Sequence, residues 1–183
     1  NTIDLAGALR IDADVTLDGA VDFAGGIIVS GDAPVTLRNA NVIDGIGSID
    51  DEFITLINEG SIISESGEDD GEILLDTAHN TIVNNGYIAA WAGGAVTFAS
   101  AVNNSFAIYA SGGTVEFGAD VANVGIIAAS DADSAVIFKG TVDNAGSISA
   151  TGGGLIDIQG KLVQQASGAL LASGEGSVLK FHG

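Results

Sequence analysis

The 183-residue chain has no cysteine, no methionine and a single proline, and only five of its residues are lysine or arginine. The absence of cysteine excludes disulfides, thiolate zinc sites and a cysteine nucleophile. One proline is too few for a proline-rich disordered linker. No apolar run approaches the roughly 20 residues of a membrane-spanning helix, so we expect no membrane insertion of this segment.

The few bases face 24 acids, and the formal net charge is −19. Because such a chain repels nucleic acid and anionic lipid, we expect no nucleic-acid partner. Seventeen acids lie in residues 1–76, and the densest run, SGEDDGE, contains Glu68, Asp69, Asp70 and Glu72. These carboxylates are a candidate calcium site, the one cofactor that we consider. Their spacing matches neither an EF-hand nor a nonapeptide calcium repeat, so a solvated loop is the favoured interpretation.

The chain is rich in small and strand-forming residues. Hydrophobic residues make up 46% of it and 27 positions are glycine. The apolar set is mainly Val, Ile and Ala with some Phe, which favours strands over helices. We therefore predict an ordered all-β protein.

A repeat of about 20 residues runs through the middle of the chain. Four segments align: IVNNGYIAA from Ile82, VNNSFAIYA from Val102, VANVGIIAA from Val121 and VDNAGSISA from Val142. They share the pattern V/I-x-N-x-G-x-I-x-A, with Phe106 in place of one glycine. A second element, V-x-F, precedes three of them and places Phe98, Phe117 and Phe138 in one column, which Ile158 continues.

The alternation within each unit has period two, as in strands, and glycine-rich turns separate the short runs. One unit cannot bury its apolar side alone, so successive units must stack. This predicts a parallel β-helix, or β-solenoid, of roughly eight or nine coils of about 20 residues, as a single domain over residues 1–183. A helix over Lys161–Ser173 is an alternative reading of KLVQQASGALLAS.

The repeated asparagine is the best candidate for an active-site residue, and also for a structural one. It recurs at Asn84, Asn104, Asn123 and Asn144, and the segment LINEGSIIS adds Asn58. The first unit fits the same alignment with Phe23 at the asparagine position. A catalytic asparagine is expected once, whereas stacked asparagines satisfy one another's amides by hydrogen bonds. We therefore interpret the five as a structural ladder.

The outward positions of the aligned units form a candidate partner face. Both tyrosines and the only tryptophan point outward from neighbouring coils, so the face contains Tyr87, Trp91, Tyr109 and Ile126. Aromatic side chains of this kind are used in protein interfaces and stack on sugar rings. The face therefore predicts self-association or packing on another part of the protein, or binding of a glycan or protein receptor; absence of any role is the alternative.

We assign no catalytic residue. The pairs Asp50–Asp51 and Asp69–Asp70 lie in turn-like stretches, and neighbouring strand residues face opposite ways. His79 and His182 are far apart in sequence, and neither belongs to a nucleophile–base pattern. A carbohydrate-active β-helix enzyme, a polysaccharide lyase or hydrolase, is the alternative from a different class.

The stretches VDNAGSISATGGG and VANVGIIAASDADSAVIFKGTVDN resemble the right-handed β-helix repeats of autotransporter passengers and filamentous-haemagglutinin-like adhesins of Gram-negative bacteria. The resemblance is close over residues 81–160. It implies a right-handed coil and an extracellular, cell-surface rod that serves in adhesion, self-association or as a stalk. Because the repeat continues to VLKFHG without a polar cap, we expect a piece of a longer protein or an end-to-end assembly.

Overall fold

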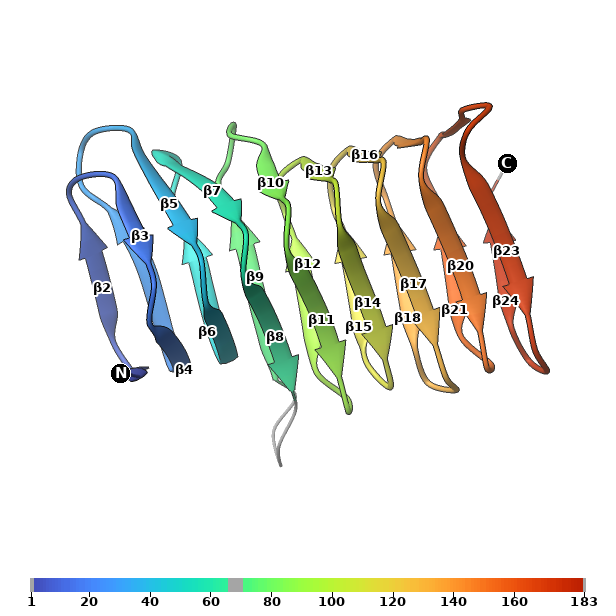
Figure 1. Ribbon diagram of the computed structural model, residues 1–183, viewed down its shortest axis with the longest axis horizontal. Helices are drawn as coiled ribbons and strands as arrows, with labels where there is room; N and C mark the ends of the chain where they lie inside the picture. The colour runs from blue at the N-terminus through green and yellow to red at the C-terminus, as the bar shows by residue number, and fades with distance from the viewer. Residues whose placement is uncertain (1, 66–70, 183) are drawn as a thin grey trace.

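Parallel strands wound into a stack of coils make up the whole of the described chain, residues 2–65 and 71–182 of the computed structural model. Twenty-four strands and no helix occur in these residues, and equivalent strands recur about 21 residues apart in about eight turns. The predicted all-β solenoid is therefore confirmed, and Figure 1 shows the coils side by side from the N-terminus to the C-terminus. Accordingly, no described segment is a helix long and apolar enough to cross a membrane.

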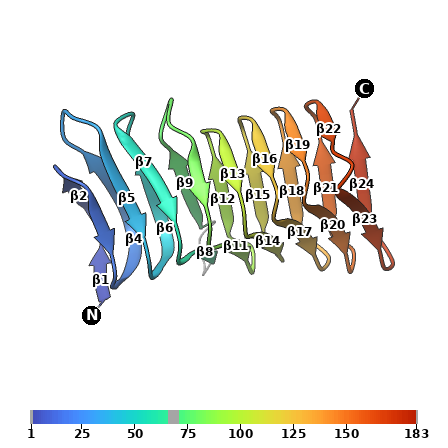
Figure 2. The ribbon, with the colours of Figure 1, turned by 45° about the horizontal axis from the view of Figure 1, so that its top comes forward.

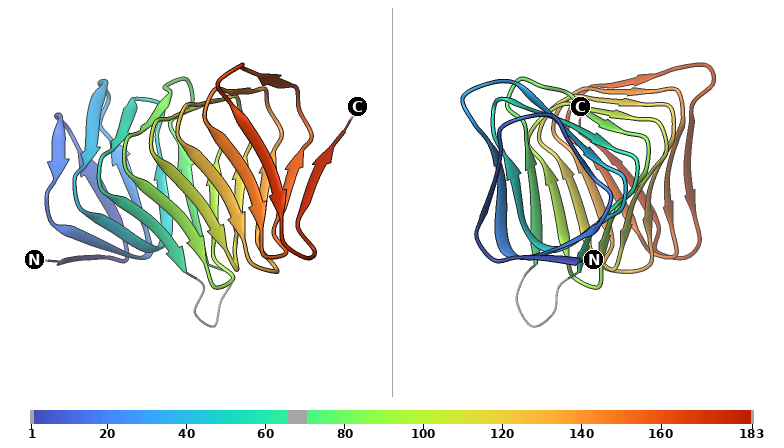
Figure 3. Two further views of the ribbon diagram at one scale, coloured as in Figure 1. Left: turned by 45° about the vertical axis from the view of Figure 1, so that its right-hand side comes forward. Right: turned by 60° about the vertical axis from the view of Figure 1, so that its left-hand side comes forward.

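Each coil runs through three faces, which are visible nearly end-on in the right-hand view of Figure 3. Face 1 and face 2 are the two ladders of the larger sheet, and face 3 is the smaller sheet. Face 1 consists of β1 (Thr2–Leu5), the first half of β4 (Ala20–Ser30), the first half of β6 (Val42–Asp50), β8 (Ser61–Glu65), β11 (Tyr87–Trp91), β14 (Ala107–Ser111), β17 (Ile126–Ser130), β20 (Ser147–Thr151) and β23 (Ala169–Ser173).

Face 2 follows face 1 along the chain in every coil, and the turned view in Figure 2 shows its strands together with those of face 3. It consists of β2 (Ala8–Ile11), the second halves of β4 and β6, β9 (Glu72–Asp76), β12 (Ala95–Phe98), β15 (Thr114–Phe117), β18 (Ala135–Phe138), β21 (Leu155–Ile158) and β24 (Val178–Phe181). Face 3 consists of β3 (Val15–Leu17), β5 (Val35–Asn39), β7 (Ile54–Asn58), β10 (Ile82–Asn84), β13 (Val102–Asn104), β16 (Val121–Asn123), β19 (Val142–Asn144) and β22 (Leu162–Gln164).

The interior is built from columns of identical or similar side chains, one from each coil. Phe98, Phe117 and Phe138 are fully buried and stack with ring centroids 4.8 and 4.9 Å apart and ring planes within 5° of parallel. An isoleucine column lines face 1 from Ile62 to Ile148. Since each coil meets a copy of its own side chains, the close packing of the core follows from the repeat itself.

The register of the first coils corrects one assignment. Leu17 pairs with Asn39 on face 3, so Leu17 occupies the asparagine position of the first coil. Phe23 lies on face 1 opposite Gly45. The assignment of Phe23 to the asparagine column was therefore wrong, because β4 continues from face 1 to face 2 through a bulge at Gly25 (φ 82°) that the repeat pattern does not show.

Two other sequence features are resolved by the register. Six residues, 76–81, connect the positions equivalent to Phe98 and Val102, where the next coil uses three, so an insertion is present near DTAHNT. The helical alternative for Lys161–Ser173 is wrong, because this segment contains β22 and β23, which pair with β19 and β20.

Replacing Phe117 by alanine tests the contribution of the phenylalanine column. We expect a loss of about 3–5 kcal/mol in the free energy of unfolding. The change leaves a cavity between the rings of Phe98 and Phe138, and the coils that hold these rings prevent them from moving together to fill it. Urea denaturation followed by the fluorescence of the single tryptophan, Trp91, measures this loss. Phe181→Ala is the matched control, since Phe181 continues the same column but is 53% exposed. An equal loss for both variants would contradict the account.

Candidate functional site

The asparagine column lies inside the coil at the end of face 3, where the chain turns into face 1. The side-chain Nδ2 of each asparagine donates to the Oδ1 of the next. The bonds, all 2.8 Å long, join Asn39 to Asn58, Asn58 to Asn84, Asn84 to Asn104, Asn104 to Asn123 and Asn123 to Asn144. The amides therefore all point along the rod in the same direction, an arrangement in which hydrogen bonds polarise one another.

The second Nδ2 hydrogen of each ladder asparagine also has an acceptor. Asn84 donates to the carbonyl of Ala107, Asn104 to that of Ile126 and Asn123 to that of Ser147, at 3.1 to 3.3 Å. No buried side-chain nitrogen or oxygen in residues 2–65 and 71–182 lacks a partner. The asparagines thus use their amides within the fold and present no free group to a substrate.

Sequence reasoning missed two members of the column. Asn39 opens it, and its Oδ1 accepts from the backbone N–H of Asn41. Gln164 closes it at the C-terminal end, where its Oε1 accepts from Asn144 at 3.0 Å. The signal for Asn39 was present in VTLRN, since Asn39 lies 19 residues before Asn58.

The aromatic residues lie on the outer side of face 1, in the register that the repeat predicts. Tyr87 pairs with Ala107, Ala89 with Tyr109 and Trp91 with Ser111. The rings pack on one another, with centroids 5.6 Å apart for Tyr87 and Tyr109 and 6.1 Å apart for Tyr87 and Trp91. The outward alanines of this face, Ala89, Ala107 and Ala128, are buried. Burial also raises the pKa of the Tyr87 hydroxyl.

Three exposed apolar side chains lie at the corner between face 3 and face 1, and two of them are the most exposed large apolar residues in the described part of the chain. Val124 is 64% exposed, Phe106 is 57% exposed and Ile126 is 42% exposed. Phe106 and Val124 were not among the predicted face residues. The sequence feature that could have identified Phe106 is its replacement of the glycine found at this position in the other repeats. We call Phe106, Val124 and Ile126 the apolar corner.

The N-terminal part of face 1 has a different character. Asp4 pairs with Asp22 and Asp22 with Asp44, so three aspartates stack outward in successive coils. On β8 the position that pairs with Asp44 is Ile63, and Glu65 lies two residues further along the same strand. Burial and the neighbouring charges of Asp22 and Glu65 raise the pKa of the Asp44 carboxyl. We call the three stacked aspartates, Asp4, Asp22 and Asp44, together with the flanking Glu65, the acidic column.

Most of the candidate calcium site lies outside the part of the chain that the structure describes. Glu68, Asp69 and Asp70 lie outside the described residues, and Glu72 is exposed on β9. Within the described ranges, no group of three or more acidic or histidine side chains is arranged to hold a metal ion.

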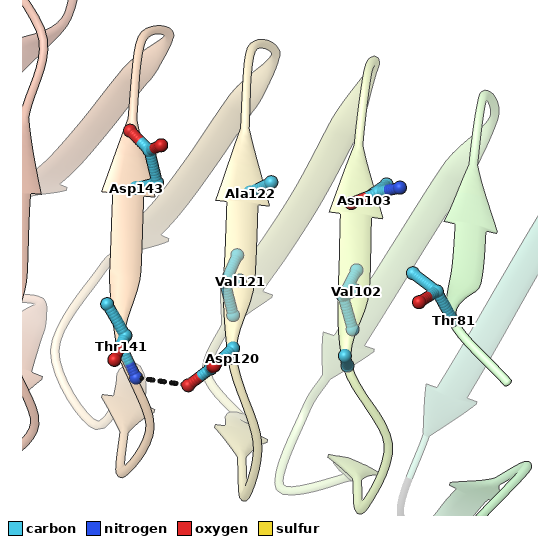
Figure 4. Close-up of a pocket in the computed structure, with 9 residues that line it drawn as sticks. Thr81, Val102, Asn103, Asp120, Val121, Ala122, Thr141 and Asp143 are labelled. Carbon is cyan, nitrogen blue, oxygen red and sulfur yellow. Dashed lines mark hydrogen bonds between the residues drawn. The ribbon is translucent and has the colours of Figure 1, made fainter. Parts of the chain in front are cut away.

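A shallow groove of about 210 Å³ crosses the outer side of face 3 over β13, β16 and β19 (Figure 4). Its polar lining includes Asn103, Asp120, Thr141 and Asp143. Asp120 accepts from the backbone N–H of Thr141 at 2.7 Å, and Asp143 accepts from Gln165 at 2.6 Å. Both carboxylates are therefore engaged in bonds between coils.

One further charged cluster lies at the C-terminal end of face 2. Asp157 is buried, and its carboxylate contacts Gln159 at 3.0 Å, His182 Nε2 at 2.8 Å and Lys180 at 3.6 Å. Gln159, then His182 and Lys180, lower the pKa of Asp157. The contact between His182 and Asp157 joins β24 to the preceding coil. The other histidine, His79, is far from His182 in sequence and lies in an exposed turn.

No protein-family model, curated protein or solved structure matches this chain. The assignment to the β-solenoid class accordingly comes from the fold itself, and the resemblance to adhesin repeats remains an expectation.

Replacing Asn104 by alanine breaks the ladder at its centre. The change leaves the buried Oδ1 of Asn123 and the carbonyl of Ile126 without the Asn104 donor, and removes the acceptor of Asn84. We expect a loss of about 2–5 kcal/mol in the free energy of unfolding, because each unsatisfied buried group costs about 1–3 kcal/mol. Asn103→Ala, one residue away and exposed, should change it by less than about 0.5 kcal/mol. Comparable losses from the two changes would disprove the structural role.

Replacing Asp44 by asparagine tests the acidic column. A raised pKa means that the folded protein disfavours ionised Asp44, so ionisation destabilises the fold as pH rises through the carboxyl range. We expect Asp44→Asn to increase the free energy of unfolding at pH 7 by a few tenths of a kcal/mol. The gain should vanish below about pH 3, where the wild-type carboxyl is protonated in both the folded and the unfolded state. Denaturation curves of both proteins at the two pH values measure this gain. Destabilisation by Asp44→Asn at pH 7 would contradict a repulsion between Asp44 and its acidic neighbours.

Proposed function

We propose that this chain is a structural and adhesive β-solenoid segment of a secreted bacterial surface protein. The observation that carries the proposal is the continuous internal ladder from Asn39 to Gln164, which spans most of the rod. The features that recur from coil to coil, the asparagine, phenylalanine and isoleucine columns, all serve the stacking of one coil on the next. A chain built in this way fits a role in spacing and presenting surfaces.

The mechanism of such a segment is mechanical. Eight coil-to-coil steps of about 4.8 Å give a rod about 40 Å long. Parallel strands, the phenylalanine column and the asparagine ladder join each coil to the next, so bending or stretching the rod would break several interactions together. The acidic surface keeps copies apart and soluble, while the apolar corner and the aromatic rings offer a limited region for contact.

A carbohydrate-active enzyme is the second candidate, and the groove on face 3 is the observation in its favour. Hydrolysis of a glycosidic bond commonly uses two carboxyl groups on either side of the bond, and Asp120 and Asp143 are the two acids in the groove. Both carboxylates already accept hydrogen bonds from the next coil, which favours a structural role for them.

Surface exposure on the producing bacterium tests the proposal directly. Antibodies raised against the purified chain should label intact cells, and permeabilisation should add little to the signal. An antibody against a cytoplasmic protein of the same cells serves as the control and should label only permeabilised cells. Labelling by the chain-specific antibody only after permeabilisation would refute a surface role.

Release of reducing ends from bacterial or host polysaccharides by the purified chain would favour the enzyme instead. In that case Asp120→Asn and Asp143→Asn should each abolish the release.

A further inference from the structure

Phe106 occupies a position at which the neighbouring coils require glycine. A Cβ atom added to Gly86 would lie 2.2 Å from the carbonyl oxygen of Gly60, and one added to Gly125 would lie 2.2 Å from that of Phe106. Contacts this short force the backbone to shift. The side chain of Phe106 therefore enters the corner at the expense of the regular stacking of the coils.

The hydrogen bond beside Phe106 is correspondingly long. The backbone N–H of Ala107 donates to the carbonyl of Gly86 at 3.4 Å, whereas the equivalent bonds of Tyr87, Ile126 and Ser147 are 2.7 to 2.8 Å. In exchange, the ring gains little burial, since 57% of Phe106 remains exposed. A residue that weakens the local fold without a packing gain indicates a role outside the fold.

The surface around Phe106 is both apolar and uncharged. The next coil places Val124 and Ile126 at the same corner, where Ile126 donates its N–H to the carbonyl of Phe106 at 2.7 Å. Residues 80–115 contain no charged side chain, although the whole chain carries −19. The strands of face 1 from β11 to β23 likewise contain only uncharged residues.

Charge on face 1 is thus divided along the rod, with the acidic column at one end and the uncharged part at the other. Two copies of a strongly acidic chain repel each other least where neither brings charge to the contact. If the copies were parallel, the acidic column of one would face that of the other. If they were antiparallel, each acidic column would lie beyond the uncharged part of its partner.

We propose that the uncharged part of face 1, with the apolar corner, is an isologous docking surface for a second copy of this chain in antiparallel orientation. The inference adds a specific partner to the proposed rod function and does not depend on where the protein is located. The self-complementary contact brings Phe106 of each copy toward the apolar corner and aromatic rings of the other, as a two-fold interface requires.

The size of this surface sets the expected strength of the contact. Five strands about 4.8 Å apart and five residues long, at about 3.3 Å per residue, cover about 400 Å² of projected area per copy. Stable interfaces bury about 800 Å² per partner, so this surface has about half of the standard size. We therefore expect weak, concentration-dependent association rather than an obligate dimer.

The variant Phe106→Gly separates a docking role from a folding role, because it restores the glycine of the neighbouring coils. We expect sedimentation equilibrium to show a monomer–dimer equilibrium for the wild type, and a dissociation constant raised at least tenfold for Phe106→Gly. The melting temperature of Phe106→Gly should equal or exceed that of the wild type. Val178→Ser, which removes a 45% exposed apolar residue on face 2, should leave both quantities unchanged.

Salt and a distance measurement test the partner and its orientation. Association should strengthen between about 50 and 500 mM salt, because salt screens the repulsion between the copies. Since the chain has no cysteine, Thr16→Cys on the first coil takes a single spin label. Five coil-to-coil steps lead from Thr16 on β3 to β16, next to Ile126 on the middle strand of the docking surface. A two-fold axis near Ile126 therefore separates the two labels by about 50 Å along the rod in the antiparallel dimer.

Three results would overturn the proposal. The first is a wild-type chain that stays monomeric at all salt concentrations and up to millimolar protein. In that case the apolar corner would contact another part of the protein or another partner. The second is a Phe106→Gly variant that dimerises like the wild type or melts well below it. The third is a spin-label distance far shorter than 50 Å, as a parallel pair would give. Failure here would not alter the cell-labelling result, which tests the proposed function separately.

Discussion

Every coil of this protein must bury its inward side chains against nearly the same set in the coils above and below. For apolar residues this stacking brings identical shapes into contact, as in the phenylalanine column. For a polar residue it is far more restrictive, because a buried amide needs both donors and its acceptor satisfied at every level. Asparagine meets this requirement, since its Oδ1 accepts from one neighbour while its Nδ2 donates to the other neighbour and to a backbone carbonyl.

The remaining features of the rod follow from that column. The ladder fixes the position at which face 3 ends, and the tight corner that follows brings one coil's backbone against the next, which explains glycine at positions such as 86 and 125. The outer side of the coil is free of these restrictions. Charge, aromatic rings and the apolar corner are distributed there unevenly, and this is where functional differences between coils can arise without loss of the fold.

The periodic part of the structure could be predicted from the sequence, and the irregular part could not. The columns of Phe98 and Asn84 follow from spacings of about 20 residues, because stacking repeats a side chain at the same place in each coil. Phe23 was misplaced because the bulge at Gly25 allows one long strand to serve two faces, which no local pattern reveals. On the surface, the aromatic face could be read from alternation. The exposure of Val124 depends on corner geometry, which alternation does not describe.

Hydrogen exchange of side-chain amides, measured by NMR, tests the central role of the ladder most directly. The account predicts that the Nδ2 protons of Asn58, Asn84, Asn104, Asn123 and Asn144 exchange only on opening of the coils, as slowly as the core backbone amides. The exposed amides of Asn85 and Asn103 should exchange at the rate of a free side chain. Ladder amides that exchange as fast as that of Asn103 would contradict the account.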